Sequence, residues 1–440
     1  MKTNKPIVVI GAIIAFLLVI TIGLFLFLKN RSNGDNQDQE LKPIGEPIAE
    51  QIAGLEGANQ NANGVESDDK KESESSNETI EEKEPTEEEI FAARIEEILD
   101  GMSLDEKIYQ MFVVAPEQLV GGSGITVFGE EVLNKLKEQP IGGFIFFGSN
   151  VREKDQTKNM LKTALSYGYE VEGLPLFLGT DEEGGRVARI AGNPNFGEVN
   201  VGAMGKIKTA NEALSAGAYI GCYMSSIGFN LDFAPDADVI TVASNTAIGD
   251  RSFGSDPQVV SDFAASFSDG LHNSHILSTY KHYPGHGATL TDTHHGLTYI
   301  NKTYEEMQQA ELVPFAQAQE NDIDMIMVAH ISLPNITGDD TPCSLSHLMI
   351  SDYLRNDMGY DGIVITDALN MDAVTNIYDN KTMAVMAVDA GNDILLMPRN
   401  IKDAHDAIFD AISEGTITEE RINESVRRII KAKLYLMDAQ

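Results

Sequence analysis

Short apolar runs alternate with longer amphipathic stretches from Ile90 to the end of the chain. Nearly continuous apolar runs are typical of parallel strands that are buried on both faces. The stretches between the runs, such as 211–227 and 257–272, are long enough for crossover helices. Eight runs have the length of a strand: Gln110–Val114, Gly143–Phe147, Leu174–Leu178, Asn230–Ala234, Ile276–Tyr280, Asp324–Val328, Gly362–Ile365 and Asp393–Met397.

Eight units of strand followed by helix predict an α/β fold, a single (β/α)8 barrel of the TIM type. An open doubly wound sheet is the competing architecture. Such a sheet normally carries a glycine-rich phosphate fingerprint after its first strand. The first run is followed instead by Ala115 and Pro116, which favours the barrel.

The N-terminal apolar segment has the length of a membrane span. It runs from Ile7 to Leu28 without a charged residue, and a helix of that length rises about 33 Å, enough to cross the hydrocarbon core. A cleaved signal peptide is the alternative, but its apolar region would be unusually long and no A-x-A-like site follows. We therefore expect residues 1–32 to be an N-terminal membrane anchor, an uncleaved transmembrane helix. Its short basic N-terminus predicts a single-pass protein of the cell membrane with an extracytoplasmic catalytic domain.

Residues 33–89 are rich in Glu, Asp, Ser, Asn and Gly and lack aromatic side chains. Such a segment buries too little apolar surface to offset the conformational entropy of the chain. The sequence therefore predicts a disordered acidic linker over 33–89 and a folded catalytic domain over 90–440.

The charge and the cysteines exclude some classes of partner. The 440-residue chain has a formal net charge of -36 and a pI of about 4.4, so a nucleic acid would be repelled. Its two cysteines, Cys222 and Cys343, lie outside any CxxC pattern, so no disulfide framework or zinc knuckle is predicted. We expect a monomer.

Charged side chains gather directly after the predicted strands. The third strand leads into GTDEEGGRVAR, which contains Asp181 and Arg189. A segment after the fourth strand contains GDRSFG with Arg251, and the seventh strand ends at Asp367. Because the active site of such a barrel lies at the C-terminal ends of its strands, these side chains are expected to share one pocket.

The sequence KHYPGHGATLTDTHH, residues 281–295, holds four of the nine histidines of the chain. Asp292 lies two residues before His294, and a carboxylate in that position fixes the tautomer of an imidazole and raises its basicity. A polar surface loop and a metal site are the alternatives. A metal-dependent hydrolase on a barrel is expected to carry H-x-H at the end of the first strand, where this chain has Val114-Ala115-Pro116.

Asp367 follows four apolar residues of the seventh predicted strand. A carboxylate in this position acts in proteins as a nucleophile, a metal ligand or the N-cap of the next helix. Together with Lys281, His282 and the arginines, it suits glycoside cleavage by the retaining route. One carboxylate then attacks the anomeric carbon while a second group protonates the leaving oxygen. His294, oriented by Asp292, is the best-placed candidate for that second group.

The motifs KHYPGHG, DTH, DEEGGRVAR, GDRSFG and ITDALNM resemble the signatures of glycoside hydrolase family 3, specifically its β-N-acetylglucosaminidase branch. The resemblance covers essentially all of 90–440. It implies Asp367 as the nucleophile and His294 as the acid/base, supported by Asp292, without a metal or an organic cofactor. It further implies that the sugar's hydroxyls and N-acetyl group are held by Asp181, Arg189, Arg251, Lys281 and His282.

Three positions depart from the pattern of the branch. Ala288 and Ala368 stand where it usually has Asp, and Thr298 replaces a usual proline. None of the three removes a proposed catalytic group.

The resemblance implies a retaining exo-glycosidase, a β-N-acetylhexosaminidase, that removes terminal non-reducing β-linked N-acetylglucosamine from an amino-sugar glycoside. Peptidoglycan fragments or chito-oligosaccharides are the expected substrates. The alternatives are a metal-dependent barrel hydrolase and a catalytically inert membrane-anchored sugar-binding protein. The inert protein would need neither Asp367 nor His294, and the presence of both residues favours an enzyme.

Overall fold

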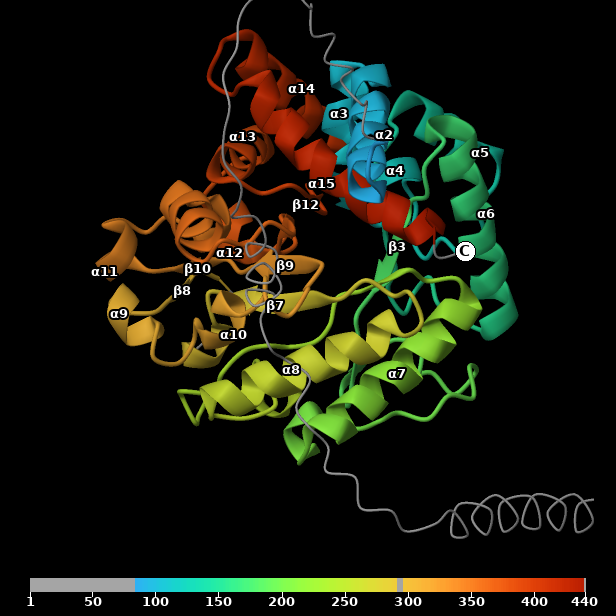
Figure 1. Cartoon of the computed structure of the whole chain (residues 1–440). Coiled ribbons are helices and arrows are strands. Elements are labelled where there is room, and N and C mark those ends of the chain that lie inside the picture. Colours follow the sequence, from blue (N-terminus) through green and yellow to red (C-terminus); the bar gives the residue numbers. More distant parts are fainter. Residues whose placement is uncertain (1–83, 291–295, 439–440) are drawn as a thin grey trace, which may run out of the picture. The chain divides into compact units, whose positions relative to one another are not determined.

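The computed structural model describes residues 84–290 and 296–438 of the chain. They belong to the second of two compact units, Glu82–Gln440 (Figure 1). The predicted transmembrane helix and residues 33–83 of the predicted linker lie outside the described residues. Within the described ranges, no helix combines the length and the apolar character that crossing a bilayer requires.

Eight parallel strands form the centre of this unit, and each overlaps one of the eight predicted runs. They are β1 (Phe112–Val114), β2 (Gly143–Ile145), β3 (Phe177–Thr180), β6 (Leu231–Asp232), β7 (Thr279–Tyr283), β9 (Met325–Val328), β11 (Ile363–Thr366) and β12 (Leu395–Leu396). Hydrogen bonds connect them in the orders β12-β1-β2-β3-β6 and β11-β9-β7. All these pairs are parallel, which explains the near-continuous apolar runs.

Isolated backbone bridges join the two groups of strands into a ring. The Asp232 N–H donates to the Leu277 carbonyl at 2.9 Å, which links β6 to the segment entering β7. The Thr366 N–H donates to the Ile394 carbonyl at 3.0 Å, which links β11 to the segment entering β12. The result is the TIM-barrel-like α/β fold that the alternation of runs predicts.

Helices lie between successive strands and cover the outside of the barrel (Figure 1). Glycines let α7 and α8 pack closely: a Cβ at Gly217 would lie 2.0 Å from the Phe267 carbonyl oxygen, and one at Gly270 2.4 Å from that of Leu214. The covering helices are α4 (Pro116–Val120), α5 (Glu130–Glu138), α6 (Lys154–Glu172), α7 (Ala210–Ile227), α8 (Pro257–His272), α9 (Tyr304–Met307), α10 (Val313–Ala316), the π-helical η7 (Leu348–Asp357), α12 (Asp372–Thr375), α13 (Asn380–Ala390) and α14 (Ile401–Ser413).

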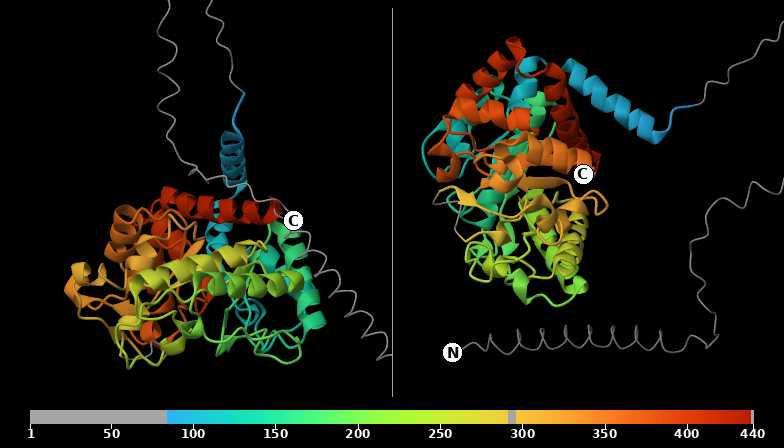
Figure 2. Two further views of the ribbon diagram at one scale, coloured as in Figure 1. Left: turned by 60° about the horizontal axis from the view of Figure 1, so that its bottom comes forward. Right: turned by 90° about the vertical axis from the view of Figure 1, so that its left-hand side faces the viewer.

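Helix α2 (Glu87–Gly101) begins inside the segment that the sequence assigns to the linker. Thr86 and Glu89 form a capping box, each side chain bonding the other residue's backbone N–H, and the acidic first turn suits the positive end of the helix dipole. The predicted boundary at residue 89 is therefore too late by most of a turn. Figure 2 shows α2 projecting from the barrel.

Helix α15 (Glu419–Asp438) closes the N-terminal end of the barrel together with α3 (Leu104–Gln110). Lys433 of α15 is buried, donates to the Gln110 side chain at 2.7 Å and lies 5.3 Å from the centroid of the Phe177 ring. Gln110 precedes β1 and Phe177 is the first residue of β3, so both partners of Lys433 lie at the N-terminal ends of strands. The opposite, C-terminal end carries the longer loops, with β4 (Glu182–Gly184), β5 (Val187–Ala188), β8 (Thr298–Tyr299), β10 (Ile331–Ser332) and α11 (Pro334–Thr337).

Candidate active site

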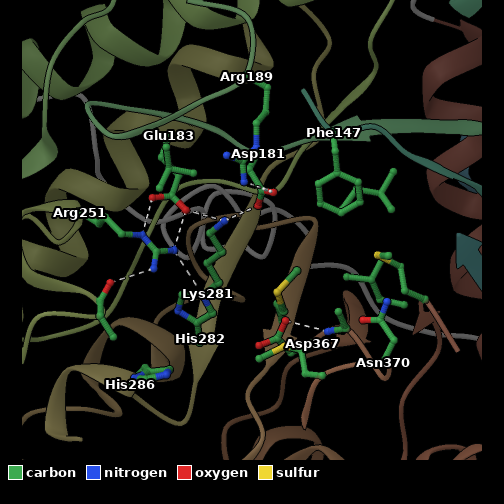
Figure 3. A pocket seen from close by; sticks show the side chains of 18 of the residues that line it. Phe147, Asp181, Glu183, Arg189, Arg251, Lys281, His282, His286, Asp367 and Asn370 are labelled. Carbon is green, nitrogen blue, oxygen red and sulfur yellow. Dashed lines mark hydrogen bonds and ion pairs between the residues drawn. The ribbon is translucent and has the colours of Figure 1, made fainter. Parts of the chain in front are cut away.

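A pocket of about 540 Å³ opens at the C-terminal ends of the strands. Its lining comes from segments that end or follow β2, β3, β6, β7, β9, β11 and β12. The structure brings six of the eight residues predicted for the site into this lining: Asp181, Arg189, Arg251, Lys281, His282 and Asp367 (Figure 3).

Five charged side chains of alternating sign form a continuous row along the pocket. Arg189 lies 3.4 Å from Asp181, and Lys281 donates to Asp181 at 2.8 Å. Lys281 also lies 2.6 Å from Glu183. Arg251 holds Glu183 through two nitrogens, at 2.7 and 2.8 Å. Ionic partners thus fix the positions of the cations, and Asp181 stays partly open to the pocket.

The row keeps its members charged at neutral pH. Burial alone would raise the pKa values of Asp181 and Glu183, but Lys281 together with an arginine, Arg189 at Asp181 and Arg251 at Glu183, outweighs it and holds both pKa values below their usual range. Burial would lower the pKa of Lys281, but Asp181 and Glu183 raise it. The pocket therefore offers fixed donors and a carboxylate acceptor to a polar, uncharged ligand.

His282 belongs to a second set of polar groups, which lies beside the row. Its Nδ1 is 2.7 Å from Asp238 Oδ2, and its Nε2 is 3.5 Å from Arg251 Nη2. Asp238 Oδ1 accepts the His286 N–H at 2.5 Å, and the His282 and His286 rings meet edge to face at 5.6 Å. Burial, followed by the neighbouring His282, lowers the pKa of His286.

Asp367 lies directly after β11 and is half-buried. Its backbone N–H donates to the Val328 carbonyl at 2.9 Å, and its Oδ1 accepts the Ala368 N–H at 2.7 Å. The N-cap of α12, the next helix, is Met371, so Asp367 does not cap it. An apolar wall beside Asp367, made by Phe147, Ile145, Leu396 and the methionines Met327, Met371 and Met397, complements the charged row.

Asp292 and His294 lie outside the described residues, so their catalytic roles stay predictions. Two of the departures from the family pattern flank this gap: Ala288 in the short helical turn η4 (His286–Ala288) and Thr298 in β8. The third, Ala368, lines the pocket, and its carbonyl lies 3.0 Å from His330 Nε2.

Glu183 belongs to the motif GTDEEGGRVAR and His286 to KHYPGHGATLTDTHH, but neither is among the residues predicted for the site, and nor are Asp236 and Asp238, which follow the fourth predicted strand. Asp236, Asp238 and His282 lie close enough together to hold a metal ion. The groups fit a metal poorly, however, because Arg251 Nε lies 3.4 Å from Asp236 Oδ2 and a hydrogen bond already joins Asp238 to His282. The position of these acids after predicted strands was the available signal for all of them.

The model of the glycosyl hydrolase family 3 N-terminal domain matches residues 103–432. The chain belongs to glycosyl hydrolase family 3. This confirms the family that the sequence motifs indicate, and the family 3 domain coincides with the barrel described above.

Relatives of this family 3 chain carry the expected enzyme name. It is 30% identical over 338 residues to β-hexosaminidase A of Pseudoalteromonas piscicida, covering 71% of this chain and 56% of that protein. It is 33% identical over 285 residues to the β-hexosaminidase of Tolumonas auensis, covering 63% and 81%. A family 3 β-N-acetylglucosaminidase structure from Paenibacillus sp. str. FPU-7 superposes with a TM-score of 0.71 at 31% identity, covering 76% and 63%. The chain thus spans little more than half the length of the Pseudoalteromonas piscicida protein. The names of these relatives confirm the predicted β-N-acetylglucosaminidase branch of the family.

Proposed function

We propose that this protein is a retaining exo-β-N-acetylhexosaminidase that releases terminal non-reducing N-acetylglucosamine. The observation that carries the proposal is the position of Asp367. It is a strand-end carboxylate in the same pocket as the row Arg189–Asp181–Lys281–Glu183–Arg251. A nucleophile beside fixed hydrogen-bonding groups is what a retaining glycosidase requires.

In the proposed mechanism Asp367 attacks the anomeric carbon and forms a covalent glycosyl-enzyme. The hydrogen bond from the Ala368 N–H holds the attacking carboxylate in place, which limits the motion it must lose in the transition state. We assign protonation of the leaving oxygen to His294, with Asp292 as its orienting partner. The same imidazole then takes a proton from the water that releases the sugar.

The charged row supports recognition of the sugar. Asp181 and Arg189 are both partly exposed, at 18% and 33% of their side-chain surface, so they can exchange hydrogen bonds with hydroxyl groups. Lys281 and Arg251 are nearly buried and ion-paired, so they lose little conformational freedom when a ligand binds. Because each group is preorganised, its hydrogen bonds also act on the transition state.

Substrate source and location form the second part of the proposal. We propose peptidoglycan fragments or chito-oligosaccharides as substrates, because both present terminal β-linked N-acetylglucosamine. We also propose that the apolar segment Ile7–Leu28 anchors the protein in the cell membrane with the catalytic unit outside. The support is the length of that uncharged segment.

Replacement of Asp367 tests the proposed reaction. We expect Asp367→Ala to lower kcat on an aryl β-N-acetylglucosaminide by about 10³-fold or more, and added azide to restore turnover with an α-glycosyl azide as product. The exposed neighbour Asp372 provides the matched control, since the Asp372→Ala variant should hydrolyse the aryl glycoside with the wild-type kcat. Hydrolysis at the wild-type rate by Asp367→Ala would refute the assignment, and loss of wild-type activity on chelation would favour the metal-dependent alternative.

A further inference from the structure

Asp238 is fully buried, and it organises the turn that follows β7. Both of its carboxylate oxygens accept hydrogen bonds: Oδ2 from His282 Nδ1 at 2.7 Å and Oδ1 from the His286 N–H at 2.5 Å. Asp238 is itself held in place, since its N–H donates to Asp236 Oδ1 at 3.1 Å and its carbonyl accepts the Ser252 hydroxyl at 2.6 Å. It therefore acts on the pocket through His282 rather than by touching a ligand.

These contacts define the protonation of the two nitrogens of His282. A carboxylate only accepts hydrogen bonds, so Nδ1 carries a proton. Nε2 faces Arg251 Nη2 at 3.5 Å, and a guanidinium only donates. Nε2 therefore carries a lone pair that faces this guanidinium, and His282 has its ring proton on Nδ1.

We infer that Asp238 is a positioning residue that locks His282 in the Nδ1–H tautomer. His282 lines the pocket, so this lock makes Nε2 an acceptor that is shared between Arg251, at 3.5 Å, and a hydroxyl or amide N–H of the bound ligand. The opposite tautomer would direct an N–H at Arg251, donor against donor. The part of the inference that concerns sugar binding rests on the proposed glycosidase function. The assignment of the His282 tautomer does not depend on that function.

The substitution Asp238→Asn distinguishes the two tautomers of His282. The introduced amide has nearly the same shape, but only one of its polar atoms accepts hydrogen bonds. The oxygen is required by the short His286 N–H contact, so the NH₂ group faces His282 Nδ1. His282 must then accept at Nδ1 and carry its proton on Nε2.

The test is ¹⁵N NMR of the histidine rings in the ligand-free full-length protein, labelled selectively at histidine, with His282→Gln to assign the signal. We expect the wild-type protein to show a protonated Nδ1 and an unprotonated Nε2 at His282. In Asp238→Asn the two signals should exchange, and kcat/KM on an aryl N-acetylglucosaminide should fall by about 10–100-fold, the usual scale for groups that orient an imidazole. Asp236→Asn is the matched control, because that carboxylate faces Arg251, and it should leave the tautomer unchanged.

A wild-type Nε2–H tautomer, or an unchanged tautomer in a folded Asp238→Asn, would overturn the inference. If Asp238→Asn fails to fold, the wild-type spectrum alone decides it. A His282 spectrum that changes when EDTA is added would also overturn it, since Nδ1 would then be a metal ligand. The expected tautomer in a protein without glycosidase activity would refute the proposed function and leave the role of Asp238 intact.

Discussion

The Lys281 ammonium lies 2.6 Å from the Glu183 carboxylate, and both side chains are at most 2% exposed. The same carboxylate accepts two hydrogen bonds from Arg251, so the buried Glu183 anion fixes the positions of both Lys281 and Arg251. When one partner of a buried ion pair is removed, the other keeps the cost of its desolvation without compensation. Glu183 is therefore important for the site even though its own surface is hidden from a ligand.

We predict that Glu183→Gln raises KM for an aryl N-acetylglucosaminide and lowers kcat/KM by at least about 10-fold, since about 1.4 kcal/mol of lost positioning has that effect. Glu182 gives a matched control. It is also buried, but it accepts from the Ile190 and Ala191 N–H groups and the Tyr223 hydroxyl. Glu182→Gln should lower Tm and leave KM near the wild-type value. Equal kinetic effects of the two substitutions would contradict the role given to Glu183.

The roles of His294 and its neighbour His295 can be distinguished by replacing each residue and measuring how the loss of rate depends on the leaving group of the substrate. If His294 protonates the leaving oxygen, His294→Ala should slow a natural disaccharide far more than an activated aryl glycoside. The activated aglycone departs with little protonation, so the glycosyl-enzyme forms and accumulates. His295→Ala should show no such dependence. Equal losses of His294→Ala on both substrates, or selectivity in His295→Ala, would overturn the assignment of the acid/base.

The proposed anchor predicts the topology of the chain. Protease added outside intact cells should reach residues beyond Asn33, because the short basic N-terminus is expected to stay inside. A cytoplasmic protein in the same cells provides the control for lysis. If the catalytic unit survives in intact cells and is digested only after lysis, the predicted orientation is wrong.

Buried Lys433 predicts a pH-dependent stability. Burial lowers the pKa of this ammonium from 10.5 to about 7, although the nearby Glu172 carboxylate opposes the shift, so between pH 7 and 10.5 the unfolded chain binds more protons than the folded one. Stability from this group therefore rises with pH over that window and is lowest below pH 7. We expect Lys433→Met to raise Tm at pH 6 and to lose this advantage near pH 10, where wild-type Lys433 folds uncharged and still bonds Gln110. A gain in Tm that is independent of pH would contradict this account.

The strands and the location of the site could be predicted because both depend on local pattern. Apolar runs mark strands buried on two faces, and a residue such as Asp367 directly after a run must lie at the C-terminal edge of the barrel. The predicted boundary between linker and folded domain lies too late because a charge-rich composition is typical of a linker, whereas capping by Thr86 and favourable dipole interactions begin a helix there.

The contacts within the site could not be predicted from the sequence in the same way. Asp181, Glu182 and Glu183 are consecutive acids, and only the direction of β4 decides that Glu183 faces the pocket while Glu182 bonds behind it. Asp238 and His282 are separated by 44 positions, and their contact depends on β6 and β7 being neighbours in the ring.

The alternating order of the row has a consequence for how ligands arrive. Four of its five charges cancel in pairs of opposite sign, whose potential decays much faster with distance than that of a single ion, and the row keeps a net charge of only +1. An uncharged sugar therefore experiences these groups only on contact, and they neither steer it from afar nor depend on the ionic strength of the medium. The long-range potential of the protein comes instead from its net charge of -36, which disfavours the approach of polyanions. Repulsion of polyanions at a distance and recognition of the sugar at close range thus depend on different charges in the same chain.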